Sequence, residues 1–483
     1  MIKSANDQAF DFVLEDQHEF AAISGDYNPL HLDPVYARRT MFGAPVVHGI
    51  NAFLTGWATI SGEPRDIKRI STRFNKPVFL NESVTVRCRD NTADRLVFDL
   101  LVDRELRISA TIDFSDKPPP DSSETLLEAA GKTVMQSPSE FPEGEQGKLK
   151  LHLDQNQFDK KYPALTWLPN MVKAQVLATT RLVGMITPGE DSIFSEMELS
   201  FSKPMDNQST YLTYTNEKYD DRFRLLQIAL VGQGLKGRLK AFHRPKSITQ
   251  PGMAEIVSAC RKMDRGDAKV LIVGGSRGLG ETAAKTFAAL GCDVAISYSS
   301  GEQDAKRITD EICSAGERAE YVEINISDNE TITRLTNSGD QFDIVLYFAT
   351  PPIFRGSKVF SESLLKEFLE YYVFGFERLV RGIHKKDRPL LVFYPSTVAI
   401  TDNTPKMMEY ITAKSAGEQF CRAYESNYPA LSILVERLPR LPSDQTQTLM
   451  AIPFEMSTLE YMSGLAKRLL AEYIKSSRSS VGS

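Results

Sequence analysis

The stretch Ile23-Ser24-Gly25-Asp26-Tyr27-Asn28-Pro29-Leu30-His31-Leu32-Asp33 says more about the fold than any other part of the chain. An acid and an imidazole stand five positions apart, and Asn28-Pro29 between them predicts a turn that brings both to one side. His48-Gly49 follows seventeen residues after His31 and opens an apolar run, which predicts a helix over about residues 49–60. The N–H of Gly49, at the positive end of that helix, would be a fixed hydrogen-bond donor.

These residues suit the addition of water to a double bond that is conjugated with a carbonyl group. Asp26 and His31 can hold one water between them as base and acid. The N–H of Gly49 would stabilise the charge that develops on the carbonyl oxygen. Taken alone, the Asp-His pair also allows a structural interpretation, in which Asp26 caps a turn and His31 is a structural histidine. We expect His48 to orient the turn at Gly49 rather than to act in catalysis.

The pattern Asp26-x-Asn28-Pro29-Leu30-His31-x-Asp33, followed by Phe42-Gly43-x-x-Val46-Val47-His48-Gly49, resembles the signature of MaoC-like (R)-specific enoyl hydratases of the hotdog fold. The resemblance covers the first segment of the chain, residues 1–116. It implies reversible hydration of a trans-2-enoyl thioester to an (R)-3-hydroxyacyl thioester, with Asp26, His31 and Gly49 as catalytic residues. The thioester partner would be acyl-CoA or an acyl carrier protein.

The chain of 483 residues is long enough for about three domains. A polar segment with Pro118-Pro119-Pro120 predicts a linker over residues 117–147, and a second break predicts a connector over 246–266. The expected domains are therefore a catalytic hotdog over 1–116, a second hotdog over 148–245 and a third domain over 267–475. Residues 476–483 are expected to be a disordered tail.

The first two domains look like copies related by an offset of 127 residues. Phe74-Asn75-Lys76-Pro77 matches Phe201-Ser202-Lys203-Pro204, and the alternating run Val84–Arg87 falls on Tyr211–Tyr214. Each copy predicts one apolar helix, over about 49–60 and 170–185, followed by several strands. A long helix wrapped by an antiparallel sheet is the hotdog arrangement, so this half is expected to be an α+β double hotdog.

The second copy does not repeat the acid–base pair. The offset places Leu153 and Phe158 opposite Asp26 and His31, and neither side chain can transfer a proton. His152 and Asp154 lie nearby but lack the Asn-Pro and His-Gly context. We expect this copy to be non-catalytic and to complete the interface between the halves and the acyl-chain tunnel.

The third domain alternates strands and helices, which predicts a doubly wound parallel α/β sheet of the Rossmann type. Gly274-Gly275-Ser276-Arg277-Gly278-Leu279-Gly280 lies between a buried strand and a helix, where it would cradle a pyrophosphate at the helix N-terminus. Six strand-like runs are expected at 270–273, 294–298, 321–325, 344–348, 390–394 and 431–435. A long helical run is expected over 360–381.

The glycine run, Ser396 and Tyr410-x-x-x-Lys414 together resemble the short-chain dehydrogenase/reductase family, and within it the β-ketoacyl reductases. The resemblance implies NAD(P)-dependent reduction of a 3-oxoacyl thioester. Ser396 would polarise the carbonyl, Tyr410 would donate the proton, and Lys414 would favour the phenolate and hold the nicotinamide ribose. Taken alone, Tyr410 and Lys414 are also an ordinary pair on one helix face.

The end of the second strand favours NADPH over NADH. Ser297-Tyr298-Ser299-Ser300 contains no acidic residue to bind a ribose 2′-hydroxyl, and Arg277 with these serines suits a 2′-phosphate. The expected cofactor-binding residues are Gly274, Ser276, Arg277, Gly278, Leu279, Gly280, Ser299 and Lys414.

This domain also departs from its family. Tyr347-Phe348 stands where the family has an Asn-Asn pair, Tyr372 replaces a helix asparagine, and Arg440 replaces the glycine of a Pro-Gly pair. No seventh strand is expected before the C-terminus. Two functions therefore stay open: a bifunctional reductase and dehydratase, or a hydratase whose third domain is a degenerate nucleotide-binding or interaction module. Intact Asp26, His31 and Gly49 argue against a non-enzymatic acyl-binding scaffold.

The net charge, the apolar runs and the cysteines argue against several other classes of protein. A net charge of −6 argues against a nucleic-acid surface, and no apolar run is long enough to span a membrane. The five cysteines lack paired spacing and a zinc pattern, so we expect free thiols, no metal site and a cytoplasmic protein. The reductase-like domain is compatible with a homodimer.

Overall fold

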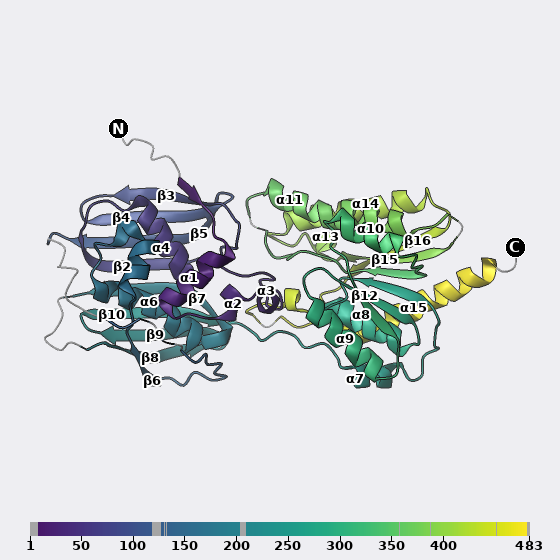
Figure 1. Ribbon diagram of the computed structural model, residues 1–483, viewed down its shortest axis with the longest axis horizontal. Coiled ribbons are helices and arrows are strands. Elements are labelled where there is room, and N and C mark those ends of the chain that lie inside the picture. Colours follow the sequence, from purple (N-terminus) through teal and green to yellow (C-terminus); the bar gives the residue numbers. More distant parts are fainter. Residues whose placement is uncertain are drawn as a thin grey trace. The chain divides into compact units, whose positions relative to one another are not determined.

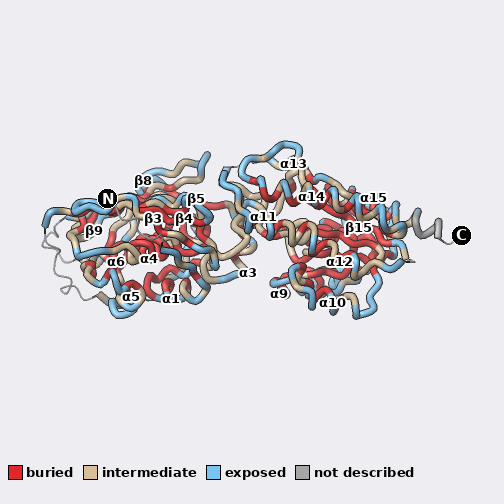
Figure 2. Tube along the Cα trace, turned by 90° about the horizontal axis from the view of Figure 1, so that it is seen from above, coloured by how far each residue is buried: buried red, intermediate tan, exposed pale blue. Residues whose placement is uncertain are grey.

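The computed structural model describes residues 8–117, 127–129, 131, 133–202, 209–356, 358–386, 388–450 and 452–480, with side chains up to 475. The chain divides into two compact units, Met1–Lys246 with Thr448–Ala451, and Ser247–Gln447 with Ile452–Ser483 (Figure 1). Each unit has its own buried interior, as the colouring by burial in Figure 2 shows. Among the described residues, no helix combines the length and the apolar character needed to cross a bilayer.

The first unit is built on one antiparallel sheet of ten strands, in the order β1-β3-β4-β5-β2-β7-β10-β9-β8-β6. The two halves meet where β2 pairs with β7, with Ile70 opposite Leu199. The strands of the first half are β1 (Gln8–Phe10), β2 (Asp66–Phe74), β3 (Val84–Asn91), β4 (Arg95–Val102) and β5 (Glu105–Ser115). Those of the second half are β6 (Gln146–Lys150), β7 (Ser192–Phe201), β8 (Tyr211–Asp220), β9 (Leu225–Gly232) and β10 (Leu235–His243).

Both halves repeat the same strand order, in which the first strand is outermost and the second lies at the junction. β3 begins at Val84 and β8 at Tyr211, which is the offset of 127 residues expected from the sequence. The repeated Lys203-Pro204 lies outside the described residues. The double hotdog expected from the sequence is confirmed.

One long helix per half packs on the sheet. These helices are α4 (Gly49–Ile60) and α6 (Asn170–Met185), with the bounds expected from their apolar runs (Figure 1). Phe53 and Trp57 of α4 and Leu177 and Leu182 of α6 belong to one buried cluster that runs through both halves. Because the cluster is continuous, the two halves share a core rather than having one each.

The second unit contains a parallel six-stranded sheet in the order β13-β12-β11-β14-β15-β16, which confirms the Rossmann-type α/β fold. The strands are β11 (Lys269–Val273), β12 (Asp293–Tyr298), β13 (Ala319–Glu323), β14 (Ile344–Tyr347), β15 (Leu390–Thr397) and β16 (Leu431–Leu438). The main helices are α7 (Met253–Cys260), α8 (Gly278–Ala289), α9 (Glu302–Ser314), α10 (Asn329–Asn337), α11 (Glu362–Leu369), α12 (Gly375–Ile383), α14 (Met408–Glu425) and α15 (Thr458–Ser480).

Helices cover both faces of this sheet because its strands are apolar on both sides. Val270 and Ile272 of β11 pack in a cluster with residues of α7, α8 and α15. Leu271 and Val273 of the same strand pack in a second cluster with residues of α10, α11, α12 and α14. Alternate residues of one strand therefore supply two cores.

The structure differs from the expectations at three places in the chain. The helical run over 360–381 is broken by a π-helical turn at Glu370–Phe374, between α11 and α12. Helix α15 continues to Ser480, beyond the expected start of a disordered tail at 476, and 481–483 lie outside the described residues. In the expected linker, residues 118–126, 130 and 132 lie outside the described residues, but Phe141 is buried against Tyr219 and His243.

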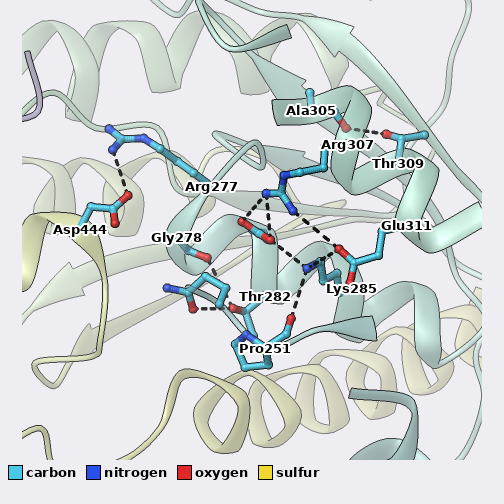
Figure 3. Close-up of polar contacts among 12 residues, drawn as sticks. Pro251, Arg277, Gly278, Thr282, Lys285, Ala305, Arg307, Thr309, Glu311 and Asp444 are labelled. Carbon is cyan, nitrogen blue, oxygen red and sulfur yellow. Dashed lines mark hydrogen bonds and ion pairs between the residues drawn. The ribbon is translucent and has the colours of Figure 1, made fainter. Parts of the chain in front are cut away.

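Residues 247–266 of the expected connector belong to the second unit, where an ionic network around the buried Lys285 holds them (Figure 3). Nζ of Lys285 on α8 contacts Glu281 Oε1 at 2.8 Å, Glu311 Oε2 at 2.8 Å and the carbonyl oxygen of Pro251 at 3.2 Å. The Met253 N–H donates to Glu311 Oε1 at 2.7 Å. The contacts of Pro251 and Met253 tie the connector to Lys285 on α8 and to Glu311 on α9. Breaking the ion pairs of Lys285 would leave a buried charge unpaired.

Candidate active sites

The loop that carries the first candidate site is shaped by a helix end and a helix start. Helix α1 (Leu14–Ser24) ends at Gly25, whose φ of 75° is the left-handed conformation that glycine adopts easily. Helix α2 (Pro29–Leu32) begins after Asn28, whose side chain accepts a hydrogen bond from the N–H of Leu30 at 3.0 Å. These two local signals place Asp26 and His31 beside one cavity, as the sequence predicts.

The surroundings of His31 define which of its nitrogens is protonated. Nδ1 lies 2.6 Å from the carbonyl oxygen of Val46 and, because a carbonyl only accepts, carries the proton. Nε2 is therefore the bare nitrogen of the neutral ring. The ring stacks on that of His48 with centroids 3.8 Å apart. Burial lowers the pKa of His31, and the nearby charge of Asp26 opposes this shift.

Asp26 is almost fully buried, and both oxygens of its carboxyl group have partners. Oδ1 accepts from the N–H of Asn28 at 3.2 Å, and Oδ2 accepts from Oγ1 of Thr180 at 2.6 Å. Burial raises the pKa of Asp26, whereas the charge of His31 and the hydrogen bonds lower it. Burial thus shifts the pKa of the carboxyl group upward and that of the imidazole downward, which brings the two values closer together.

His48 and Gly49 lie where the sequence predicts them. Nδ1 of His48 lies 3.0 Å from Oε1 of Gln17, and Nε2 lies 3.1 Å from the carbonyl oxygen of Asp26. Gly49 is the first residue of α4, so its N–H has no carbonyl partner within the helix. One ligand atom each of Asp26, His31 and His48 lies within 4.8 Å of the others, which would suit a metal ion, but both His48 nitrogens already face carbonyl oxygens.

The cavity has a volume of about 220 Å³, and both hotdog halves line it. The first half supplies Asp26, His31 and Gly49 together with apolar side chains such as those of Val47 and Phe74. Residues of the second half that line it include Thr180, Val183, Gly184, Ile193, Phe194 and Phe242. The expectation that the second copy contributes to the tunnel agrees with this lining.

The second copy has no acid–base pair at the corresponding positions. Leu153 and Phe158 are buried in the common core. Asp154 caps α5 (Gln155–Lys161) by accepting from the N–H of Gln157 at 3.0 Å. Thr180 and Gly184, which contact Asp26, were missed by sequence analysis because they lie in a helix whose pattern predicts only burial.

The glycine loop of the second unit has the shape expected for a dinucleotide site. Gly274 and Gly278 have φ values of 77° and 55°, and a Cβ at Gly280 would lie 2.2 Å from the carbonyl oxygen of Gly274. The loop therefore requires glycine at these positions, and it leads directly into the N-terminus of α8, where a pyrophosphate binds in this type of fold. Ser276 and Leu279 lie in the same loop, so the residues fit the cofactor that the fold implies.

Two residues, Ser299 and Arg277, are expected near the adenosine ribose. Ser299 is exposed directly after β12. Nη1 of Arg277 lies 3.5 Å from Oδ2 of Asp444, which was not foreseen from the sequence (Figure 3). A 2′-phosphate would have to share Arg277 with this carboxylate.

Ser396, Tyr410 and Lys414 are all buried, but their contacts differ from the expected ones. Oγ of Ser396, at the end of β15, donates to Oε1 of Glu418 at 2.6 Å. Arg437 holds the same carboxylate through Nε at 2.7 Å and Nη2 at 2.9 Å. The hydroxyl that would polarise a substrate carbonyl is therefore already committed to an anion.

Lys414 has two partners within its own domain. Its Nζ donates to the carbonyl oxygen of Pro395 at 2.7 Å and lies 3.9 Å from the centre of the Tyr372 ring. Burial lowers the pKa of Lys414 to about 7 and raises that of Tyr410 to about 12. Burial raises the pKa of Tyr410, and a hydrogen bond with Thr397 opposes this shift.

The other departures from the family fill the interior near this site. Tyr372 lies in the π-helical turn, and its hydroxyl is 2.5 Å from Oγ1 of Thr350. The buried hydroxyl of Tyr347 donates to the carbonyl oxygen of Tyr371 at 2.6 Å. Phe348 packs against Phe393, and Arg440 donates to the carbonyl oxygen of Ile452 at 2.8 Å. These side chains have structural partners of their own.

Comparisons with known proteins agree with both domain assignments. Residues 6–103 match the family model for the MaoC-like domain, and residues 268–439 match that for short chain dehydrogenases. The chain thus carries an N-terminal MaoC-like hydratase domain and a C-terminal short-chain dehydrogenase domain. The second of these implies NAD(P) as cofactor.

Individual relatives match only parts of the chain. The (R)-specific enoyl-CoA hydratase of Aeromonas caviae is 40% identical over 70 residues, 14% of this chain and 52% of that protein. The 3-hydroxyacyl-thioester dehydratase Y of Mycobacterium tuberculosis is 36% identical over 90 residues, 17% of this chain and 31% of that protein. The hydroxynaphthalene reductase-like protein Arp2 of Metarhizium majus is 26% identical over 167 residues, 32% of this chain and 60% of that protein. The chain thus spans about half the length of the first relative, and less of the second.

Proposed function

We propose that the first unit catalyses the reversible hydration of trans-2-enoyl thioesters to (R)-3-hydroxyacyl thioesters. The observation that carries this proposal is the buried pair of Asp26 and His31, which faces a cavity with the bare Nε2 of His31 available. The similarity to an (R)-specific enoyl-CoA hydratase supports it. Acyl-CoA and acyl-carrier-protein thioesters both fit the chemistry.

The residues account for each part of the reaction. The Asp26–His31 pair takes a proton from water while the water oxygen bonds to C3 of the enoyl group. The electron pair of the double bond moves toward C2, and the thioester oxygen takes up negative charge opposite the N–H of Gly49. The pair then returns a proton to C2, so that one water is added and no proton is gained or lost.

We further propose that the second unit reduces 3-oxoacyl thioesters with NADPH, which would supply the (R)-3-hydroxyacyl thioester that the first unit dehydrates. The glycine loop and the N-terminus of α8 would hold the dinucleotide, with Arg277 and Ser299 near a 2′-phosphate. When bound, the nicotinamide supplies a hydride to the carbonyl carbon. Tyr410 would give its phenolic proton to the carbonyl oxygen, and Ser396 would orient that oxygen.

A second candidate function is hydration alone, with the second unit binding a nucleotide without turnover. The specific observation in its favour is the hydrogen bond that commits Ser396 to Glu418, together with Lys414 lying over Tyr372. In that arrangement both residues are engaged elsewhere, and burial raises the pKa of Tyr410 to about 12.

One experiment separates the two functions. Purified full-length protein is mixed with acetoacetyl-CoA and NADPH, and both the nicotinamide absorbance and the acyl products are followed. Consumption of NADPH with formation of 3-hydroxybutyryl-CoA and crotonyl-CoA supports the bifunctional enzyme, provided that Tyr410→Phe abolishes the first step and Asp26→Asn the second. Hydration of crotonyl-CoA without NADPH consumption, repeated with an acyl-carrier-protein substrate, favours hydration alone.

A further inference from the structure

One hydrogen bond links the second hotdog half to the carboxylate of Asp26 in the first half. Thr180 lies on α6 of the second half, is buried, and donates from Oγ1 to Asp26 Oδ2 at 2.6 Å. We propose that Thr180 is a positioning residue for the hydration reaction, so that the half without an acid–base pair completes the active site. This inference rests on the proposed hydratase function of the first unit.

Helix α6 is shaped around this carboxylate at two positions, not one. Gly184 lies four residues after Thr180 and therefore on the same helix face. A Cβ at Gly184 would lie 2.3 Å from Asp26 Oδ1. The carbonyl oxygen of Gly184 also accepts from Nδ2 of Asn28 at 2.9 Å. The helix thus offers Asp26 a hydroxyl donor and, one turn further, the space that only glycine leaves.

The neighbouring Thr179 shows that the bond of Thr180 is directed and not a general property of threonine in this helix. Thr179 is equally buried, and its Oγ1 donates to the carbonyl oxygen of Val176, one turn back in the same helix, at 2.7 Å. A helical threonine satisfies its hydroxyl in this way by default. Thr180 instead donates out of the helix to the other half of the unit.

The bond has two consequences for Asp26. Because Oδ1 accepts from Asn28 and Oδ2 from Thr180, the carboxyl group is held in one orientation toward the cavity. Donation by Thr180 also favours the ionised form and opposes the effect of burial on the pKa of Asp26. The titratable groups that face Asp26 are His31, His48 and Arg181, and Thr180 adds a hydrogen-bond donor that does not titrate.

The test compares Thr180→Val, Thr180→Ser and the matched control Thr179→Val in the full-length protein, with crotonyl-CoA as substrate. Valine keeps the shape of threonine and removes the hydroxyl. We expect Thr180→Val to lower kcat by about ten- to a hundredfold, as for the loss of a hydrogen bond to a charged group, with KM changed by less than about twofold. The acidic limb of the pH profile should move to higher pH, and Thr180→Ser should retain most of the activity.

The result that overturns the proposal is a Thr180→Val protein with the kcat and pH profile of the wild type, or a Thr179→Val protein with the same loss. A second measurement does not depend on turnover: the carboxyl carbon of Asp26 is titrated by NMR in protein with ¹³C-labelled aspartate, assigned with Asp26→Asn. The pKa of Asp26 should rise in Thr180→Val and stay unchanged in Thr179→Val. If the wild type fails to hydrate any enoyl thioester, the proposed function fails, and this titration still shows whether Thr180 acts on the carboxyl group of Asp26. If Thr180→Val does not fold, Thr180→Cys, which is similar in size and a weak donor, replaces it.

Discussion

Replacing Gly184 with alanine should disable the first active site while leaving the fold intact. The added Cβ would lie 2.3 Å from Oδ1, 2.6 Å from Oδ2 and 2.7 Å from Cγ of Asp26. Ordinary contacts of a Cβ begin near 3.4 Å, so the carboxyl group has to move by about 1 Å. The helix itself gains about 0.5–1 kcal/mol from the change, because alanine is the better helix former.

A displacement of about 1 Å at the reacting groups costs on the order of a hundredfold in rate. We therefore expect kcat for hydration of crotonyl-CoA to fall about a hundredfold in Gly184→Ala, with a thermal midpoint within a few degrees of the wild type. Initial rates from the loss of enoyl absorbance and a thermal unfolding curve on the same sample provide both numbers.

The matched control is Gly56→Ala on α4, the corresponding long helix of the other half. A Cβ there would lie 2.6 Å from Cδ2 of Leu100, so the clash falls on the core and not on Asp26. This variant should lose stability but keep its kcat for the folded fraction. The reasoning is refuted if folded Gly184→Ala keeps kcat within about threefold of the wild type, or if Gly56→Ala loses as much kcat as Gly184→Ala.

Three further outcomes are expected. Burial lowers the pKa of His243 to about 4, so its contribution to the stability of the first unit is present above pH 6.5 and is lost as the pH falls toward 4. Thermal midpoints between pH 7 and 5 should fall less steeply in His243→Asn than in the wild type, and equal slopes would contradict this. Tyr372→Asn should release Lys414 from the aromatic ring and raise the rate of NADPH-dependent reduction of acetoacetyl-CoA, whereas an unchanged rate would show that Tyr372 does not limit this site. Arg277→Leu should weaken NADPH binding by about tenfold and NADH binding little, measured by nicotinamide fluorescence, and equal effects would refute the assignment of Arg277 to a 2′-phosphate.

Local patterns were sufficient for most of the fold. The run from Val294 to Tyr298 is apolar and short, as a strand covered on both faces must be, and it forms β12. The apolar run over 170–185 forms α6 with the expected bounds. The π-helical turn at Glu370–Phe374 was not predictable, because a single extra residue in a helix leaves no periodic signal.

In the candidate sites, too, some features follow from local sequence patterns and others do not. Asp26, His31 and Gly49 lie on a short stretch whose turn and helix start are encoded locally, so the sequence predicts their arrangement. Ser396 and Lys414 were also found by their spacing, but their contacts with Glu418 and Tyr372 come from elements far apart in the chain. Spacing therefore identified candidate residues of the reductase site without revealing which side chains contact them.

By itself, the sequence determined the two fold classes, the repeat within the first unit and the candidate acid–base residues, because each depends on periodicity or on neighbours within a few positions. Only the tertiary structure decided that α6 of the second half supplies Thr180 and Gly184 to Asp26, and that Glu418 holds Ser396. Those contacts join residues that leave no recognisable pattern in the sequence around them. The helix propensity of threonine at position 180 does not depend on where its hydroxyl points. Only the packing of one half against the other gives that hydroxyl a partner.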